Sequence, residues 1–440
     1  MKIKPISDFF NNEYVNYASY DVIRKIPSLI DGQKNAARKA LWYVVNKNLN
    51  HPSKEVKVSQ LDSKVAESEE YLHGSMAGVI VNLAQDYPGT NNMNMLFPSG
   101  NFGTRLVPEA SASRYIYTYG TQDLFSLINK EDHHILEGQT FEGHDIEPKF
   151  LLPSLPLLLI NGTEGIASGY ASKILPRNPE LIKKYLTSTL KGDKKAPRNL
   201  WVPYFKGFRG TVAQGEENQW IISGAITRKA NKVTITELPI GYNLKSYIKV
   251  LDRLEEQKLI VSYCDFTEDN FSFLVTFNRK ILDNLSDEAL LDYLKLRKKV
   301  TENFTTLNAL NQVQVFQNPE EIFNEYYQVK LRYIQKRKDQ LIASWTQNIR
   351  EQVSRYMFIK GIQDETIIIN KRSQNDIIKS LQGAPKIIQK DSSYDYLLNM
   401  PISSLSKEKM ERLLVQIKTT KESLDKIKTS PLEQMWLEDL

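Results

Sequence analysis

Largely apolar side chains in the second half of the chain recur in the alternating three- and four-residue steps of a coiled-coil seam. The two series are Ile322, Tyr326, Val329 and Tyr333, followed by Met410, Leu413, Ile417, Thr420, Leu424 and Ile427. Only an α-helix brings residues at these spacings onto one face. We therefore expect two long helices of opposite direction, with a globular insertion at about residues 357–405. A helical hairpin packed on its own domain fits the same spacing.

A chain of 440 residues is too long for one ordinary core, so we expect an α/β protein of several domains. Residues 1–150 combine helical patterns, such as that from Ala36 to Val44, with a strand-rich segment around residues 95–120. This combination favours a winged-helix domain. Residues 151–310 contain strand-like runs at Lys232–Thr236 and Phe271–Phe277, which indicate an α/β domain. Residues 311–440 form the expected coiled coil.

The composition is that of an ordinary globular protein. The 58 basic and 52 acidic side chains give a formal charge of +6, which permits a polyanionic partner without identifying one. The single cysteine, Cys264, excludes an intrachain disulfide and suits a reducing cytoplasm.

The N-terminus lacks the apolar core of a signal peptide. The most apolar stretch, Phe150–Ile160, is too short to span a bilayer, so we expect buried strands or a domain junction there and no membrane association.

A tyrosine stands directly after an arginine in the run Ser113–Thr118. A phenol can attack a phosphodiester and retain the bond energy in a phosphotyrosine, while a guanidinium neutralises charge on the phosphate oxygens. Tyr115, Tyr117 and Tyr119 also alternate, as they would on an edge strand with one aromatic face. The run alone is compatible with either interpretation.

Blocks of sequence around this tyrosine, in the same order, resemble the DNA breakage–reunion region of type IIA DNA topoisomerases. They are more similar to the eukaryotic enzyme than to the corresponding gyrase chain, gyrase A. The blocks are Gly100–Leu106, Ala112–Ile116, Asn161–Ile166, Tyr204–Thr211, Ile235–Gly241, Tyr396–Pro401 and Trp436–Leu440. The resemblance implies a winged-helix breakage domain, a tower domain and a C-gate that dimerises through the insertion.

The resemblance also implies roles for individual residues. Tyr115 matches the nucleophile, and Arg114 and Arg24 match arginines that hold the scissile phosphate. His73 matches a histidine expected to donate a hydrogen bond to that phosphate. The family pattern changes beside it, because Leu72 replaces a first histidine and Ser75 replaces an acidic residue.

Residues that would contact DNA follow from the same blocks. Ile166 matches the isoleucine that wedges between base pairs and bends the duplex. Lys34, Arg38 and Lys39 are expected to form a phosphate-contacting face on one helix. The other cationic candidates along the bent DNA arm are Lys173, Lys206 and Arg209.

Parts of the family's machinery have no counterpart in the sequence. We find neither a nucleotide-binding loop nor the acidic block that holds Mg²⁺ in the family, so we expect no metal ligand in this chain. The expected partners are double-stranded DNA, a second copy of the chain at the C-gate, and a subunit supplying ATP binding and a Toprim site for Mg²⁺. A chain that begins at the breakage domain and ends at Leu440 resembles the separate cleavage subunit of T-even-type bacteriophages. The expected location is then the host bacterial cytoplasm.

The predicted function is cleavage and resealing of DNA by an ATP-dependent type II topoisomerase, through a 5′-phosphotyrosyl intermediate and passage of a second duplex. The alternative is an architectural DNA-binding protein with winged helices and a dimerising coiled coil, without catalysis. A tyrosine recombinase fits less well, because its tyrosine would lie near the C-terminus whereas Tyr115 lies early.

Overall fold

The computed structural model describes residues 5–68, 74–141 and 143–440. Contacts divide the chain into two units, Met1–Lys330 with Trp436–Leu440, and Leu331–Met435. We call them the cleavage unit and the arm unit. The boundary at residue 150, between the first two predicted domains, stays a prediction.

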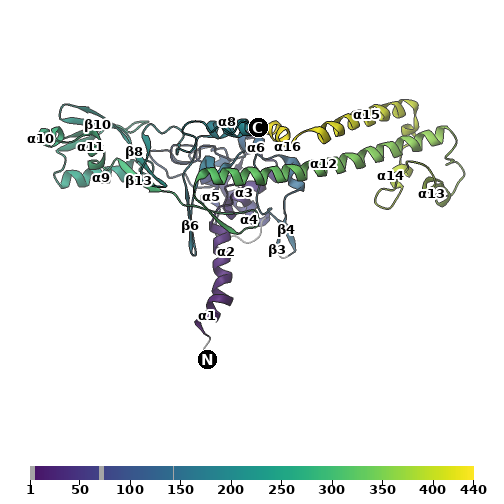
Figure 1. Cartoon of the computed structure of the whole chain (residues 1–440), viewed down its shortest axis with the longest axis horizontal. Coiled ribbons are helices and arrows are strands. Elements are labelled where there is room, and N and C mark those ends of the chain that lie inside the picture. Colours follow the sequence, from purple (N-terminus) through teal and green to yellow (C-terminus); the bar gives the residue numbers. More distant parts are fainter. Residues whose placement is uncertain (1–4, 69–73, 142) are drawn as a thin grey trace. The chain divides into compact units, whose positions relative to one another are not determined.

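The first part of the cleavage unit is mainly helical. Its helices are α1 (Ile6–Phe9), η1 (Phe10–Tyr14), α2 (Val15–Lys25), α3 (Asn35–Asn46), η2 (Pro52–Lys54), α4 (Val58–Ser68), α5 (Ala77–Ala84), α6 (Gln122–Leu127) and η3 (Lys130–His134). Figure 1 shows α1 and α2 projecting from the rest of this unit. Ala40, Leu41 and Val44 of α3 are buried, so the helical periodicity predicted there is confirmed.

The segment at residues 95–120 is less regular than predicted. Its only named strand in the described residues is β2 (Tyr117–Thr118), which pairs antiparallel with β1 (Val56–Lys57). Pro98 and Pro108 lack an amide hydrogen for a strand ladder. Gly100 and Gly103 have φ of 105° and 87°, which an extended strand does not allow. The expectation of a strand-rich segment is therefore wrong.

Two larger antiparallel sheets follow in the same unit. One has the strand order β11 (Ser262–Asp265), β12 (Phe273–Thr276), β10 (Lys232–Glu237) and β9 (Ala225–Lys229). The other has the order β13 (Arg297–Thr301), β8 (Gln219–Ser223) and β7 (Thr211–Gln214). Val233 and Ile235 face the core with Phe273 and Val275, beneath α9 (Leu244–Glu256), α10 (Arg279–Asp283) and α11 (Asp287–Tyr293). Both predicted strand-like runs are thus strands of one sheet.

Short hairpins and helices complete the cleavage unit. They are β3 (Gln139–Phe141), β4 (His144–Ile146), α7 (Leu157–Asn161), β5 (Thr163–Ala167), β6 (Tyr170–Ile174), α8 (Pro179–Leu190), β14 (Phe304–Leu307) and β15 (Val313–Phe316). The apolar stretch Phe150–Ile160 is buried as predicted, although it ends in α7 and contains no named strand. No helix in the described ranges is long and apolar enough to cross a bilayer.

The residues at 436–440 pack on the cleavage unit beside the start of α12 (Pro319–Gln363). Trp436 belongs to α16 (Leu432–Glu438), is fully buried and donates its indole N–H to the Ser154 carbonyl at 2.9 Å. Tyr326 of α12 lies against its ring and donates to the Pro153 carbonyl at 2.6 Å. The first apolar series at 322–329 therefore contributes to the core of the cleavage unit.

The arm unit consists of antiparallel helices with a globular tip (Figure 1). Lys338 of α12 donates to the Ser430 carbonyl just after α15 (Lys407–Thr429), and Gln363 at the end of α12 donates to Leu405 just before it. Leu413, Ile417 and Leu424 are buried, as the predicted seam requires. The tip contains α13 (Gln374–Gln382), α14 (Asp395–Leu398) and η4 (Ile402–Leu405), and has its own apolar core around Leu381 and Leu397.

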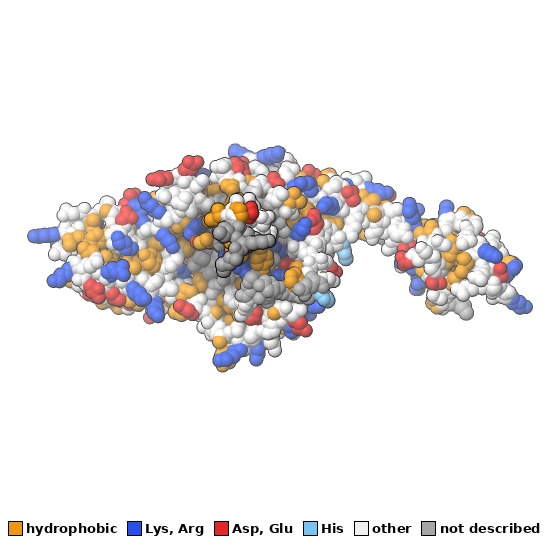
Figure 2. Space-filling model, turned by 90° about the horizontal axis from the view of Figure 1, so that it is seen from below, with side chains coloured by type: hydrophobic (Ala, Val, Ile, Leu, Met, Phe, Trp, Pro, Cys, Tyr) orange, Lys and Arg blue, Asp and Glu red, His pale blue; other side chains and the backbone are white. Residues whose placement is uncertain are grey.

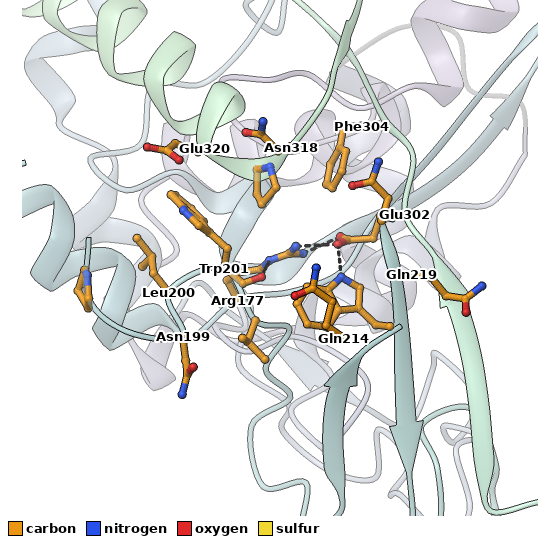
Figure 3. A pocket seen from close by; sticks show the side chains of 15 residues that line it. Arg177, Asn199, Leu200, Trp201, Gln214, Gln219, Glu302, Phe304, Asn318 and Glu320 are labelled. Carbon is orange, nitrogen blue, oxygen red and sulfur yellow. Dashed lines mark hydrogen bonds and ion pairs between the residues drawn. The ribbon is translucent and has the colours of Figure 1, made fainter. Parts of the chain in front are cut away.

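A buried ion pair fixes the base of the β5–β6 hairpin in the cleavage unit (Figure 3). The Glu302 carboxylate accepts from both terminal nitrogens of Arg177, at 2.6 and 2.7 Å, and both side chains are inaccessible to solvent. It also accepts from the Trp220 indole at 2.8 Å and from the Leu175 amide at 2.7 Å. The pair borders a cavity of about 380 Å³ near the start of α12.

Candidate active site

The turn before β2 presents Tyr115 to solvent. Its side chain is 66% exposed, whereas the next residue, Ile116, is buried. The Tyr115 amide donates to the Ala112 carbonyl at 2.8 Å, and the Val58 amide at the start of α4 donates to the Ile116 carbonyl at 3.0 Å. The backbone of the turn is therefore held in place while the phenol points away from the core. Tyr115 lies outside β2, so the interpretation of the tyrosine run as a regular edge strand is wrong.

Arg114 accompanies the exposed phenol. Its guanidinium carbon lies 5.0 Å from the centre of the Tyr115 ring. A guanidinium at this position offers N–H donors and positive charge beside a potential nucleophile.

A cationic pocket lies at the end of α2. It has a volume of about 280 Å³. Arg24 and Lys25 line it together with Lys34, which precedes the first residue of α3. The amide groups that begin α3 and the three cations both favour an anion. Burial lowers the pKa of the Lys34 ammonium, and the charge of Glu164 acts in the opposite direction.

The other wall of this pocket includes the residues before α5. Gly74, Ser75 and Met76 line it, and Asp62 of α4 accepts from the Ser75 hydroxyl at 2.6 Å and the Met76 amide at 2.7 Å. The Ser75 hydroxyl in turn accepts from the amide of Ala77, the first residue of α5, at 3.2 Å. His73 and Leu72 lie outside the described residues. Tyr115 does not line this pocket.

The β5–β6 hairpin carries an exposed apolar side chain. Ile166 is 72% exposed and pairs with Ala171 across the hairpin. Lys173, on β6, forms an ion pair with Glu164 at 3.3 Å. Gly165 contacts the end of α2 closely, because a Cβ at this position would overlap the Lys25 carbonyl oxygen. Packing therefore places this hairpin beside the cationic pocket.

Two further predicted cations lie on the segment before β7. Lys206 is exposed, and its backbone amide donates to the Asn92 side chain at 2.8 Å. Arg209 is also exposed, pairs with Glu237 at 3.7 Å and donates to the Thr236 carbonyl at 3.1 Å.

The prediction for Arg38 and Lys39 is wrong. Arg38 is buried and its Nε donates to Asp31 at 2.6 Å, and Lys39 is buried with its Nζ 2.7 Å from Glu147. Their charges are therefore neutralised inside the cleavage unit, and neither residue belongs to a surface that contacts phosphate. Of the three cations predicted on this helix, Lys34 alone lines the pocket.

Sequence reasoning missed Asp21 and gave Lys25 no role. Asp21 is buried one turn before the end of α2, with Lys25 Nζ at 2.7 Å and the Arg24 guanidinium at 3.9 Å. The three- and four-residue spacing from Asp21 to the two cations was the available signal.

Arg114 is the charged side chain recorded against the Tyr115 ring in the part of the chain that the structure describes. No group of three or more His, Cys, Asp or Glu side chains suited to a metal occurs in the described ranges. Mg²⁺ requires oxygen ligands, chiefly carboxylates and water. We assign none of the described residues as a Mg²⁺ ligand.

Comparison with known proteins places this geometry in a family. A family model for the A chain of DNA gyrase/topoisomerase IV matches residues 24–440. The chain belongs to this family. The type IIA topoisomerase resemblance read from the sequence blocks is thereby confirmed at the level of the family.

Similar proteins include eukaryotic members of the type II topoisomerases. DNA topoisomerase 2, mitochondrial, of Dictyostelium discoideum is 31% identical over 98% of this chain and 34% of its own length. DNA topoisomerase 2 of Plasmodium falciparum has the same identity and coverage. The chain thus spans about a third of the length of these relatives.

A solved structure supports the fold class. The crystal structure of the Plasmodium falciparum topoisomerase II DNA-binding, cleavage and re-ligation domain matches with a TM-score of 0.85 and 31% identity. The match covers 98% of this chain and 63% of that one. The predicted multidomain α/β architecture is confirmed.

Proposed function

We propose that this chain is the DNA-cleaving and resealing part of an ATP-dependent type II DNA topoisomerase. The observation that carries the proposal is the solvent-exposed Tyr115 beside Arg114, in a chain of the gyrase/topoisomerase IV family. A buried tyrosine could not reach a duplex, whereas this phenol is free to approach one.

The chemistry is a reversible transesterification. The Tyr115 oxygen attacks the phosphorus, loses its proton, and the bond from phosphorus to the 3′ oxygen breaks. The departing 3′ hydroxyl takes up a proton, and the 5′ end stays bonded to the tyrosine. Attack by that 3′ hydroxyl reverses the step and reseals the strand. Arg114 and Arg24 neutralise charge that develops on the phosphate oxygens. We propose that His73 donates a hydrogen bond to the same phosphate.

We infer a curved path for DNA from four cations, of which Lys206 and Arg209 are exposed and Lys34 and Lys173 are half-buried. Lys34, Lys173, Lys206 and Arg209 contact phosphates, and Ile166 inserts between bases. The exposed position of Ile166 supports this role, because an isoleucine in a folded core would be buried. On the face shown in Figure 2, Lys and Arg side chains are distributed across the cleavage unit, interspersed with Asp and Glu side chains and with apolar and uncharged groups.

A partner subunit supplies ATP binding and the Toprim site for Mg²⁺ in this proposal. An ion held at that site would supply positive charge for the leaving 3′ oxygen. The projecting N-terminal helices support such a partner, because Phe9, Phe10 and Tyr17 are among several apolar side chains exposed on them. The exposed charged side chains of residues 5–23 are the acidic Asp8 and Glu13, which disfavours DNA as the ligand of this surface. This division resembles the T-even-type phage enzyme.

The regions then have distinct roles. We assign residues 1–150 to cleavage, residues 151–310 to the tower and residues 311–440 to a C-gate. The tip at about 357–405 pairs with its copy in a two-fold dimer, so that two Tyr115 side chains open opposite strands.

A covalent adduct is the test of this function. The chain is mixed with its ATPase/Toprim partner, Mg²⁺ and supercoiled DNA, and the mixture is denatured with detergent. We expect protein linked to the 5′ ends of DNA. An architectural protein binds and bends DNA but leaves no adduct that resists denaturation. If the complex binds DNA but forms no such adduct, the proposal is contradicted.

The difference in burial between Lys34, just before α3, and Lys39, within α3, gives a further prediction. Lys34→Ala should reduce DNA affinity and lower the slope of log affinity against log salt by about one. Lys39→Met should leave that slope unchanged but destabilise the protein by a few kcal/mol, because Glu147 loses its buried partner. Salt-dependent binding titrations and thermal unfolding of both variants measure the contrast. A reduced slope for Lys39→Met would contradict the assignment.

A further inference from the structure

We propose that Asp21 is a positioning residue that couples the exposed Ile166 hairpin to the cationic pocket at Arg24 and Lys25. The inference rests on the proposed function. It assigns to this carboxylate the task of transmitting DNA bending at the hairpin to the alignment of the scissile phosphate.

The contacts of Asp21 join two elements that are far apart in the sequence. Its Oδ2 accepts from both the backbone amide and the hydroxyl of Ser168, at 2.9 and 3.0 Å. Its Oδ1 lies 2.7 Å from Lys25 Nζ and 3.9 Å from the Arg24 guanidinium. Ser168 lies in the two-residue turn of the hairpin, between β5 and β6. One carboxylate thus binds the turn with one oxygen and the pocket cations with the other.

Packing around this carboxylate makes the connection stiff. Val22 of α2 and Ile26, the residue directly after this helix, form an apolar cluster with Ala167 of β5. Lys34 donates to the Glu164 carbonyl at 2.6 Å, so a second pocket cation also holds the hairpin. Asp21 is only 4% exposed, and its hydrogen bond with Lys25, ahead of its other contacts, lowers the pKa of its carboxyl. The group therefore acts as a buried anion.

Geometry gives the coupling a direction. Ile166 is two residues before Ser168. Displacement of the exposed isoleucine by bent DNA would therefore also displace the turn that is hydrogen-bonded to Asp21. Small displacements of a phosphate-binding group have large effects on the rate of an in-line displacement. A duplex that is bent correctly over the hairpin should consequently align the phosphate at Arg24.

A double-mutant cycle with the complete enzyme tests the coupling. The rate of adduct formation is measured in the presence of Mg²⁺ with the whole complex for wild type, Asp21→Ala, Ile166→Ala and the double variant. We expect each single change to reduce the rate by about tenfold. The double variant should stay within about threefold of the slower single variant, because both changes interrupt the same connection.

Matched variants separate coupling from general damage. Asp193→Ala removes an exposed carboxylate that also accepts a backbone amide, from Lys195 at 3.0 Å, and should leave the rate unchanged. If Asp21→Ala fails to fold, Ser168→Ala replaces it in the cycle, because it removes one hydroxyl and keeps the amide contact. Its expected effect on the rate is about threefold.

The outcomes are distinct. Independent effects, with a double variant about a hundredfold slower than wild type, would overturn the inference while leaving the proposed function intact. Unchanged rates in Asp21→Ala would also overturn it. If the wild-type enzyme forms no adduct, the proposed function itself fails.

Discussion

Tyr115→Phe is expected to reduce the yield of covalent protein–DNA adduct by on the order of a thousandfold or more, because phenylalanine has no hydroxyl that could attack the phosphorus. DNA binding should change by less than about twofold, since the removed hydroxyl belongs to a side chain that is 66% exposed and is replaced by the same ring. The adduct is measured after denaturation, and binding is measured separately without Mg²⁺.

Tyr117→Phe is the matched control. Tyr117 lies two residues further along, in β2, and its ring is covered by Lys57 at 5.9 Å. Its loss of one hydroxyl should leave adduct formation unchanged. Equal loss in both variants would show that the hydroxyls support the β1–β2 region, which contradicts the assignment of Tyr115 as nucleophile.

Glu302→Ala is expected to destabilise the cleavage unit by about 3–5 kcal/mol. The change leaves the Arg177 guanidinium buried without its bidentate partner, and it also removes the acceptor of the Trp220 indole and the Leu175 amide. Denaturant unfolding of the purified chain measures the loss.

An exposed ion pair provides the comparison for this prediction. Asp283 lies 3.8 Å from Arg228, and its side chain is 60% exposed. Asp283→Ala should change the unfolding free energy by no more than about 1 kcal/mol, because water replaces the lost contact. Similar losses in both variants would contradict the weight given to burial.

Local periodicity was sufficient to predict the arm. The three- and four-residue steps of Leu413, Ile417 and Leu424 require one buried helical face, and a second long helix had to run back beside them. The same spacing could not show that Tyr326 packs against Trp436, 110 positions later. Spacing predicts that an apolar side chain is buried, but it does not identify the residue that buries it. The start of α12 packs into the core of the cleavage unit through contacts between residues distant in the sequence.

The candidate site also contains residues whose exposure matches the sequence-based prediction and residues whose burial could not be predicted. Tyr115 and Ile166 are exposed, and the roles inferred for them from the sequence blocks stay predictions. Burial of Arg38 and Lys39 could not be read from α3, because their partners Asp31 and Glu147 lie 7 and 108 positions away. From the sequence alone, a charged side chain on a helix is predicted to be exposed to solvent. Only the tertiary structure shows that a carboxylate distant in the sequence lies beside it.

Peptide mapping of the adduct tests the central claim most directly. The complete enzyme is trapped on DNA with Mg²⁺, the complex is digested with nuclease and protease, and the nucleotide-bearing peptide is sequenced by mass spectrometry. We predict a nucleotide joined through its 5′ phosphate to the oxygen of Tyr115. A nucleotide on any other residue, or linkage through a 3′ phosphate, would contradict the account.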